Sequence, residues 1–310
     1  MIFIKNPEDY PSHFFDAGNG ADPIEEICVL AKSIYQDVDV DMLTEIHYDV
    51  VDIFTGNNPL FKRNSMYYHT LRHTMMVALA AMRLLHGLHC EQRPVDRKNV
   101  LRGLLCAYFH DIGMLVKKGD PTTNGSFYIP IHEQRSALFL KEYIAGKGWP
   151  AELAEDVDVI IAYTWLRLNP ADFRAHSPQK QILGQVVGAA DLFAQMGDRY
   201  YLESLPLLFK ELERGKLNMY ENVLDLLAHT TSFFREIVEV RLTSTYRDVF
   251  GAMQTHFRVW DGIDKNLYME SIEKNLSYIG KILQECDDID GIYARLRRKT
   301  PTLEPIESPA

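Results

Sequence analysis

The sequence has few cysteines and no long apolar run, and each shortage excludes a class of protein. Its cysteines, Cys28, Cys90, Cys106 and Cys286, show none of the paired spacings of a disulfide framework or a zinc knuckle. No apolar run approaches the roughly 18 residues that a membrane span needs. The first residues lack the basic and apolar regions of a secretory signal. We therefore expect a soluble, cytoplasmic protein with reduced thiols.

Positive charge is also in short supply. The chain has 33 Lys and Arg residues against 43 Asp and Glu residues, a formal net charge of −10. A chain this acidic is not expected to wrap the phosphate backbone of a nucleic-acid duplex. A small anionic substrate would therefore depend on local positive charge, for which a metal ion, Arg72, Lys117 and Lys118 are candidates.

The sequence lacks the alternation of apolar and polar residues that marks a half-buried β-strand, and it has no internal repeat. Apolar residues recur instead at helical spacing. Asp22, Ser177 and Asp264 mark helix starts, and Gly56 and Gly146 mark helix ends. Helices are predicted over residues 23–36, 40–54, 66–89, 100–112, 131–145, 150–168, 207–214, 220–257 and 264–285, with a further helix opening at residue 177. The prediction for 220–257 allows a break within the range. The predicted fold class is all-α.

Two histidine-rich elements follow each other along the predicted helices. On a helix, His69 and His73 stand four residues apart and share one face. The adjacent His110 and Asp111 diverge by about 100° unless their helix ends there, and Gly113 predicts that ending. Imidazole nitrogens and carboxylate oxygens together suit zinc, manganese, iron or magnesium better than copper. These residues therefore indicate part of a divalent-metal site.

Asp191 is the candidate for a further carboxylate ligand. The small residues at 188–190 allow its helix to approach neighbouring helices closely enough for a short side chain to reach a metal. Helical folds build metal sites from side chains on facing helices. The alternative is a tight helix crossing in which Asp191 is solvated. We predict that Asp191 joins the other proposed ligands, His73, His110 and Asp111.

The order of these residues resembles the H…HD…D signature of the HD superfamily of metal-dependent phosphohydrolases. The element from Tyr68 to His73 further resembles cyclic-nucleotide phosphodiesterases, in which the first histidine of such a pair donates a proton and the second binds metal. The resemblance implies an HD-type helical bundle with additional N- and C-terminal helices and one or two divalent ions. It implies hydrolysis of a small phosphate ester, with a nucleotide as the favoured class, in which His69 is the general acid and Asp111 can bridge to a second ion.

The number of metal ions stays open. His132 lies where two-metal HD proteins carry a further ligand, but it could equally be a capping residue. Residues 163–165 stand where the two-metal cyclic-dinucleotide hydrolases of the superfamily have a histidine pair, and Met114 stands where nucleotide phosphodiesterases have a histidine. These departures argue against a complete second site.

Other residues could contribute to a substrate pocket. Gln195 and Asp198 follow Asp191 on the same predicted helix face and could hold the substrate or orient neighbouring side chains. Residues 255–260 mix a cation with aromatic side chains, as a nucleobase pocket does, although a core aromatic cluster is the preferred interpretation.

The predicted organisation has four parts: an N-terminal arm and helices (1–56), an HD metal-binding domain (57–214), C-terminal helices packed on the same body (215–298) and a disordered tail (299–310). Three other functional classes remain as alternatives. They are a di-iron HD oxygenase, a catalytically silent nucleotide-binding regulator and a structural helical scaffold. The presence of the whole ligand set together with His69 argues against the last two.

Overall fold

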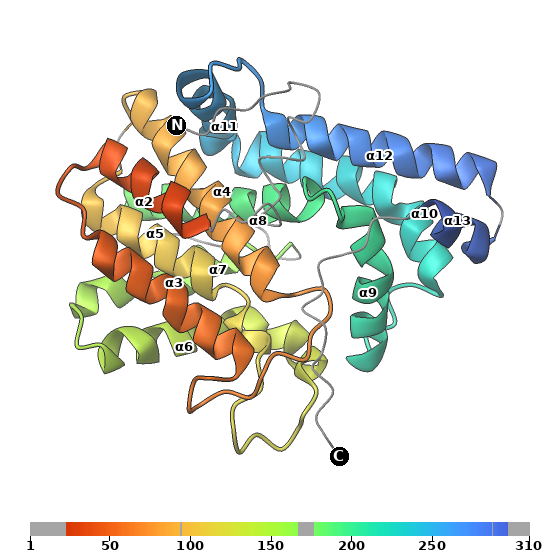
Figure 1. The fold of residues 1–310 in the computed structure, drawn as a ribbon, viewed down its shortest axis with the longest axis horizontal. Helices are drawn as coiled ribbons and strands as arrows, with labels where there is room; N and C mark the ends of the chain where they lie inside the picture. The colour runs from red at the N-terminus through yellow and green to blue at the C-terminus, as the bar shows by residue number, and fades with distance from the viewer. Residues whose placement is uncertain (1–22, 94, 167–176, 287, 297–310) are drawn as a thin grey trace.

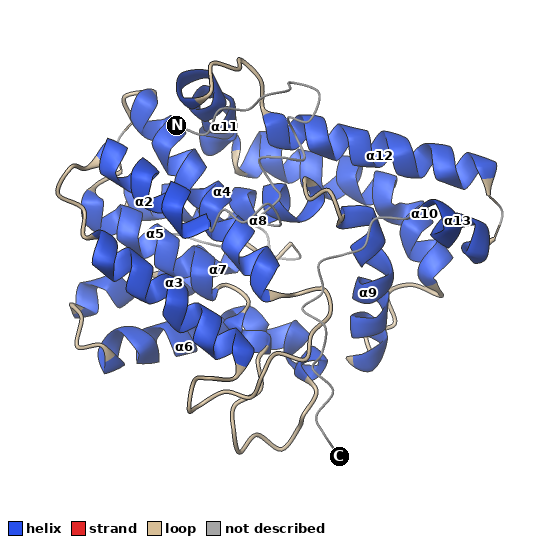
Figure 2. Cartoon of the chain, viewed as in Figure 1, coloured by secondary structure: helices blue, strands red, loops and turns tan. Residues whose placement is uncertain are grey.

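The computed structural model describes residues 23–93, 95–166, 177–286 and 288–296 (Figure 1). Every regular element within these ranges is helical, as Figure 2 shows, and their one β-interaction is an isolated antiparallel bridge between Phe61 and Lys117. The predicted all-α class is confirmed. The predicted N-terminal arm and the predicted tail at 299–310 lie outside the described residues. No helix in the described part of the chain is long and apolar enough to cross a membrane.

The α-helices are α2 (Pro23–Ile34), α3 (Val40–Thr55), α4 (Leu71–Cys90), α5 (Arg97–Phe109), α6 (His132–Gly146), α7 (Val157–Ala162), α8 (Pro178–Met196), α9 (Tyr201–Arg214), α10 (Val223–Phe233), α11 (Arg247–Trp260), α12 (Leu267–Glu285) and α13 (Ile289–Arg295). Short 3₁₀ segments lie at η3 (Ile112–Met114), η4 (Gly125–Ile131) and η5 (Ala151–Ala154), and π-helical segments lie at η7 (Phe234–Val238) and η8 (Arg241–Thr245).

Helix α4 is the centre of the fold. It packs against α2, α5, α8 and α11, which surround it (Figure 1). Residues 74–88 of α4 are buried on every side of the helix, as expected for a helix enclosed by others. Its one fully buried cation, Arg83, is satisfied by Glu26 and by the hydroxyl of Tyr268. Because α4 also begins next to the histidine motif, this central, buried helix carries part of the candidate site.

The helix boundaries around the motif correct the prediction. Thr70 has an extended backbone and its hydroxyl accepts a hydrogen bond from the His73 N–H, so α4 begins at Leu71 and not at residue 66. His69 therefore lies in the preceding loop and does not share a helix face with His73. Helix α5 ends at Phe109, before Gly113 is reached.

Gly113 serves close packing and does not end α5. A Cβ on Gly113 would lie 2.0 Å from the carbonyl oxygen of His132 and 2.7 Å from the backbone nitrogen of Ser136. Only glycine therefore lets the end of α5 sit against the first turn of α6.

Several predicted helices are divided in the structure. The segment predicted as one helix from residue 150 contains η5 and α7, separated at Asp156, whose φ is 58°. The segment predicted at 220–257 contains α10, two π-helical segments and α11. Helix α9 begins earlier than expected, at Tyr201, and α12 is capped by Asn266 in place of Asp264. Helix α13 was not predicted.

Candidate metal centre

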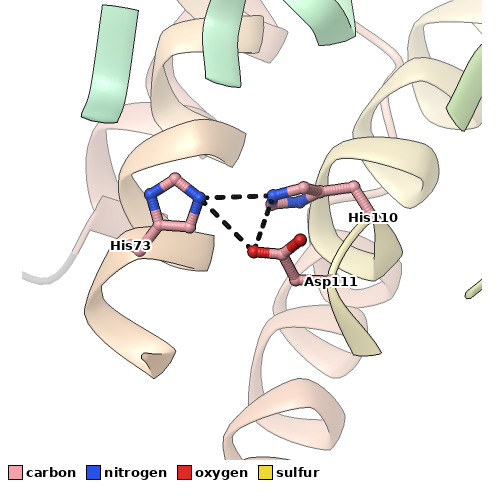
Figure 3. Close-up of side chains that lie close together, drawn as sticks. All are labelled: His73, His110 and Asp111. Carbon is pink, nitrogen blue, oxygen red and sulfur yellow. Dashed lines mark hydrogen bonds and ion pairs between the residues drawn. The ribbon is translucent and has the colours of Figure 1, made fainter. Parts of the chain in front are cut away.

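Three side chains from two helices converge beside the start of α4 (Figure 3). His73 comes from the first turn of α4, whereas His110 and Asp111 directly follow α5, between it and η3. The Nε2 atoms of the two histidines are 3.3 Å apart, and Asp111 Oδ2 lies 3.1 Å from His110 Nε2 and 3.5 Å from His73 Nε2. One ligand atom of each residue lies within 4.8 Å of the others, which is the spacing of groups that can share one cation.

Asp191 on α8 reaches the same place. Its Oδ1 lies 3.2 Å from His73 Nε2 and 3.8 Å from His110 Nε2. The small residues before it act as expected, since a Cβ at Gly188 would lie 2.7 Å from the ring of Tyr246. The structure thus brings together all four of the proposed ligands.

The hydrogen bonds of the cluster fit a cation. His110 Nδ1 lies 2.8 Å from the Ala107 carbonyl oxygen, to which it donates, so the Nε2 lone pair faces the cluster. Asp111 Oδ2 is buried and has no hydrogen-bond partner among the described residues. Two acceptors at 3.1 Å with no proton between them would repel each other. The pair is therefore stable only around a proton or a metal cation.

The electrostatics of the cluster agree with this interpretation. Burial raises the pKa of Asp111, but the imidazoles of His110, His69 and His73 outweigh burial and hold that pKa well below its usual range. Burial lowers the pKa of His110, whereas the carboxylates of Asp111 and Asp191 outweigh it and raise that pKa to about 9. The same negative field that favours a proton on His110 favours a bound cation.

His132 also lies next to this cluster. It begins α6, and its Nδ1 lies 2.6 Å from the Ile129 carbonyl oxygen, which orients Nε2 towards Asp111 Oδ1 at 3.6 Å. The two oxygens of Asp111 therefore face different histidines, an arrangement compatible with a bridging carboxylate. By contrast, Tyr163 is buried, and its ring packs against Gly184.

A buried acid, Glu211, holds His69, although no pattern in the sequence indicated this role. Glu211 Oε2 lies 2.7 Å from His69 Nδ1, and Oε1 accepts the Tyr68 N–H at 2.5 Å. Burial lowers the pKa of His69, but Glu211 outweighs it and raises that pKa to about 9. The ring centroid of His69 lies 6.4 Å from that of His73. The sequence signal for Glu211 is weak, because an acid on a partly apolar helix usually faces solvent.

A cavity of about 550 Å³ adjoins the cluster, and His73 is the cluster residue that lines it. Gln195 and Asp198 line it too. Gln195 lies on α8 as predicted, but Asp198 follows the end of α8 at Met196 and so does not share a helix face with Asp191. Asp198 forms an ion pair with Arg72, so this arginine is already engaged.

The other predicted sources of positive charge and aromatic surface lie elsewhere. Lys117 pairs with Glu142 at 2.8 Å, and Lys118 donates to the Asn58 carbonyl. His256 and Phe257, from the segment considered for a nucleobase pocket, are completely buried in the core.

No protein-family model, curated protein or solved structure matches this chain. Functional assignment therefore depends on the site itself: the ligand geometry, the buried His69–Glu211 pair and the adjoining cavity.

Proposed function

We propose that this protein is a metal-dependent phosphohydrolase that cleaves a phosphate ester, with a nucleotide as the favoured substrate class. The proposal depends on one observation: two groups of side chains with different chemistry lie next to each other. One is a His/Asp cluster fitted to a divalent cation, and the other is a buried His69–Glu211 pair fitted to proton transfer. Hydrolysis of a phosphate ester with an alkoxide leaving group uses both, because the metal supplies the nucleophile and the acid protonates the departing oxygen.

His73, His110, Asp111 and Asp191 are the residues that would hold the ion, and His132 with the second oxygen of Asp111 would hold another. Zinc, manganese, iron and magnesium suit this donor set. When bound, such an ion supplies Lewis acidity and a water of lowered pKa. The backbone carbonyls behind His110 and His132 keep their Nε2 atoms directed into the site.

His69 has the properties of a general acid. Glu211 accepts its Nδ1–H, which fixes the orientation of the ring, and raises its pKa to about 9, so the imidazole is protonated at neutral pH. The positive charge of an ion in the neighbouring cluster would lower that pKa towards neutrality, the range in which proton donation to a leaving oxygen is most effective.

The test combines metal content with leaving-group dependence. Asp111→Ala should lose bound metal in elemental analysis, whereas His69→Ala should retain it. With an alkoxide leaving group, as in a cyclic nucleotide, His69→Ala should lower kcat by about 10²–10⁴-fold, because that oxygen needs a proton. With bis(p-nitrophenyl) phosphate the loss should be small, since p-nitrophenolate leaves without one. His229→Ala, exposed on α10, is the matched control and should change neither quantity.

Some results would contradict the proposal. Wild-type protein that takes up no zinc, manganese, iron or magnesium on titration would end it. If His69→Ala lowered kcat equally for both leaving groups, or if it lost bound metal, His69 would not be the general acid. Bound iron with oxygen uptake and no ester hydrolysis would support the di-iron oxygenase instead.

A further inference from the structure

The cavity beside the metal cluster is lined by arginines that do not belong to the cluster. Apart from tyrosines, its ionisable lining consists of His73, Asp198 and three arginines, Arg63, Arg72 and Arg214. Asp198 is the one acid among them, and it pairs with Arg72. In the described part of the chain, neither Arg63 nor Arg214 forms an ion pair. Two arginines with no acidic partner among the described residues are unusual in a protein whose net charge is −10.

Both arginines are accessible, and one is held in position. Arg63 and Arg214 are exposed to solvent at the cavity. The guanidinium of Arg214 at the end of α9 lies 5.4 Å from the ring centroid of Tyr67. Stacking on an aromatic ring orients a guanidinium and leaves its N–H groups available to an anion.

Hydrogen bonds hold the loop that carries Arg63 in place. Its next residue, Asn64, donates its backbone N–H to Phe54 at the end of α3, and its side chain donates to the His69 carbonyl at 2.9 Å. Asn64 Oδ1 also accepts the Met66 N–H at 3.0 Å. In Figure 1 this loop passes between α3 and α9 on its way to α4. The loop that presents Arg63 is therefore the one that positions His69.

We propose that Arg63 and Arg214 bind a second anionic group, a phosphate or a carboxylate, on the substrate whose first phosphate lies at the metal cluster. This inference rests on the proposed function and narrows its substrate class. A volume of about 550 Å³ suits a molecule of nucleotide size rather than a free phosphate ion. Apolar side chains such as Phe54, Met66 and Leu207 line the same cavity and would contact the part between the two anions.

The experiment measures binding, independently of turnover. Metal-loaded protein is titrated in a calorimeter with adenosine 5′-monophosphate, adenosine 5′-diphosphate and adenosine 3′,5′-bisphosphate, which differ in the presence and place of a second phosphate. At least one of the doubly phosphorylated probes should bind about tenfold or more tightly than the monophosphate, as a charge-assisted hydrogen bond provides. The double variant Arg63→Gln/Arg214→Gln should lose that preference while still binding the monophosphate.

The matched control is Arg247→Gln/Arg258→Gln, which removes the same charge from exposed positions on α11 that do not line the cavity. It should keep the preference. The inference is overturned if wild-type protein shows no preference for a second phosphate, or if Arg63→Gln/Arg214→Gln keeps it. If the preference depends on these arginines but no phosphate ester is hydrolysed, the second-anion site stands and the hydrolase proposal is the one that fails.

Discussion

Acidification should destabilise the protein through two buried histidines at the crossing of α4 and α11. His86 Nδ1 and His256 Nδ1 lie 3.1 Å apart, and both side chains are buried. Burial, with a smaller contribution from His89, lowers the pKa of His86 to about 4. Burial and the charge of Arg83 hold the pKa of His256 well below its usual range. Glu26 of α2 opposes the shift of His86 but does not cancel it.

The sign and size of the effect follow from linkage. The unfolded chain binds a proton on His86 near pH 6.5, whereas the folded chain does so only near pH 4. The stability due to neutral His86 is therefore complete above pH 6.5 and is lost as the pH falls from there towards 4. By pH 5 the loss amounts to about 2 kcal/mol for His86 alone. His256 adds to it in the same direction, because its pKa is lowered too.

The assay is urea unfolding of metal-free protein at pH 7.5 and pH 5.0. His86→Leu/His256→Phe should shrink the stability difference between these pH values by about 2 kcal/mol or more relative to wild type. Asp261, whose pKa burial raises to about 6, acts in the opposite direction, but it is present in both proteins and cancels. His229→Leu, at an exposed position, should leave the difference unchanged. An equal difference in the double variant and in wild type would refute the reasoning.

Two further predictions concern packing and metal content. A Cβ at Gly87 would lie 1.9 Å from the Ala252 carbonyl oxygen, so Gly87→Ala should lower the free energy of unfolding by about 1–3 kcal/mol in urea. Gly251→Ala on the open face of α11 should raise the free energy of unfolding by up to about 1 kcal/mol. Equal effects of Gly87→Ala and Gly251→Ala would contradict the close crossing of α4 and α11. His132→Ala should retain one ion and lose any second ion in elemental analysis, since His132 faces the other oxygen of Asp111. Loss of all metal would instead make His132 essential to a single site.

Much of the fold was predictable because helical signals are local. The caps at Ser177 and Gly56 depend on side chains and backbone angles within one turn, and the structure has both where the sequence indicated. The predicted helix boundaries were wrong where a neighbouring residue offered a better cap. Thr70 is a better N-cap than its neighbours, so α4 starts after His69 and not before it. The prediction for residues 220–257 allowed a break in the helix, but it did not indicate the two π-helical segments that lie there.

The residue types and order of the candidate site came from the sequence alone: a predicted metal-ligand motif of His73, His110, Asp111 and Asp191, with His69 beside it. Only the tertiary structure decided what completes the site. Glu211 lies 142 residues from His69 in the chain and reaches it because α9 packs beside the loop before α4. Arg214 likewise borders the same cavity as Arg63. Local sequence sets which residues can bind or donate, but the packing of distant helices sets which of them meet, because burial and charge pairing depend on neighbours in space.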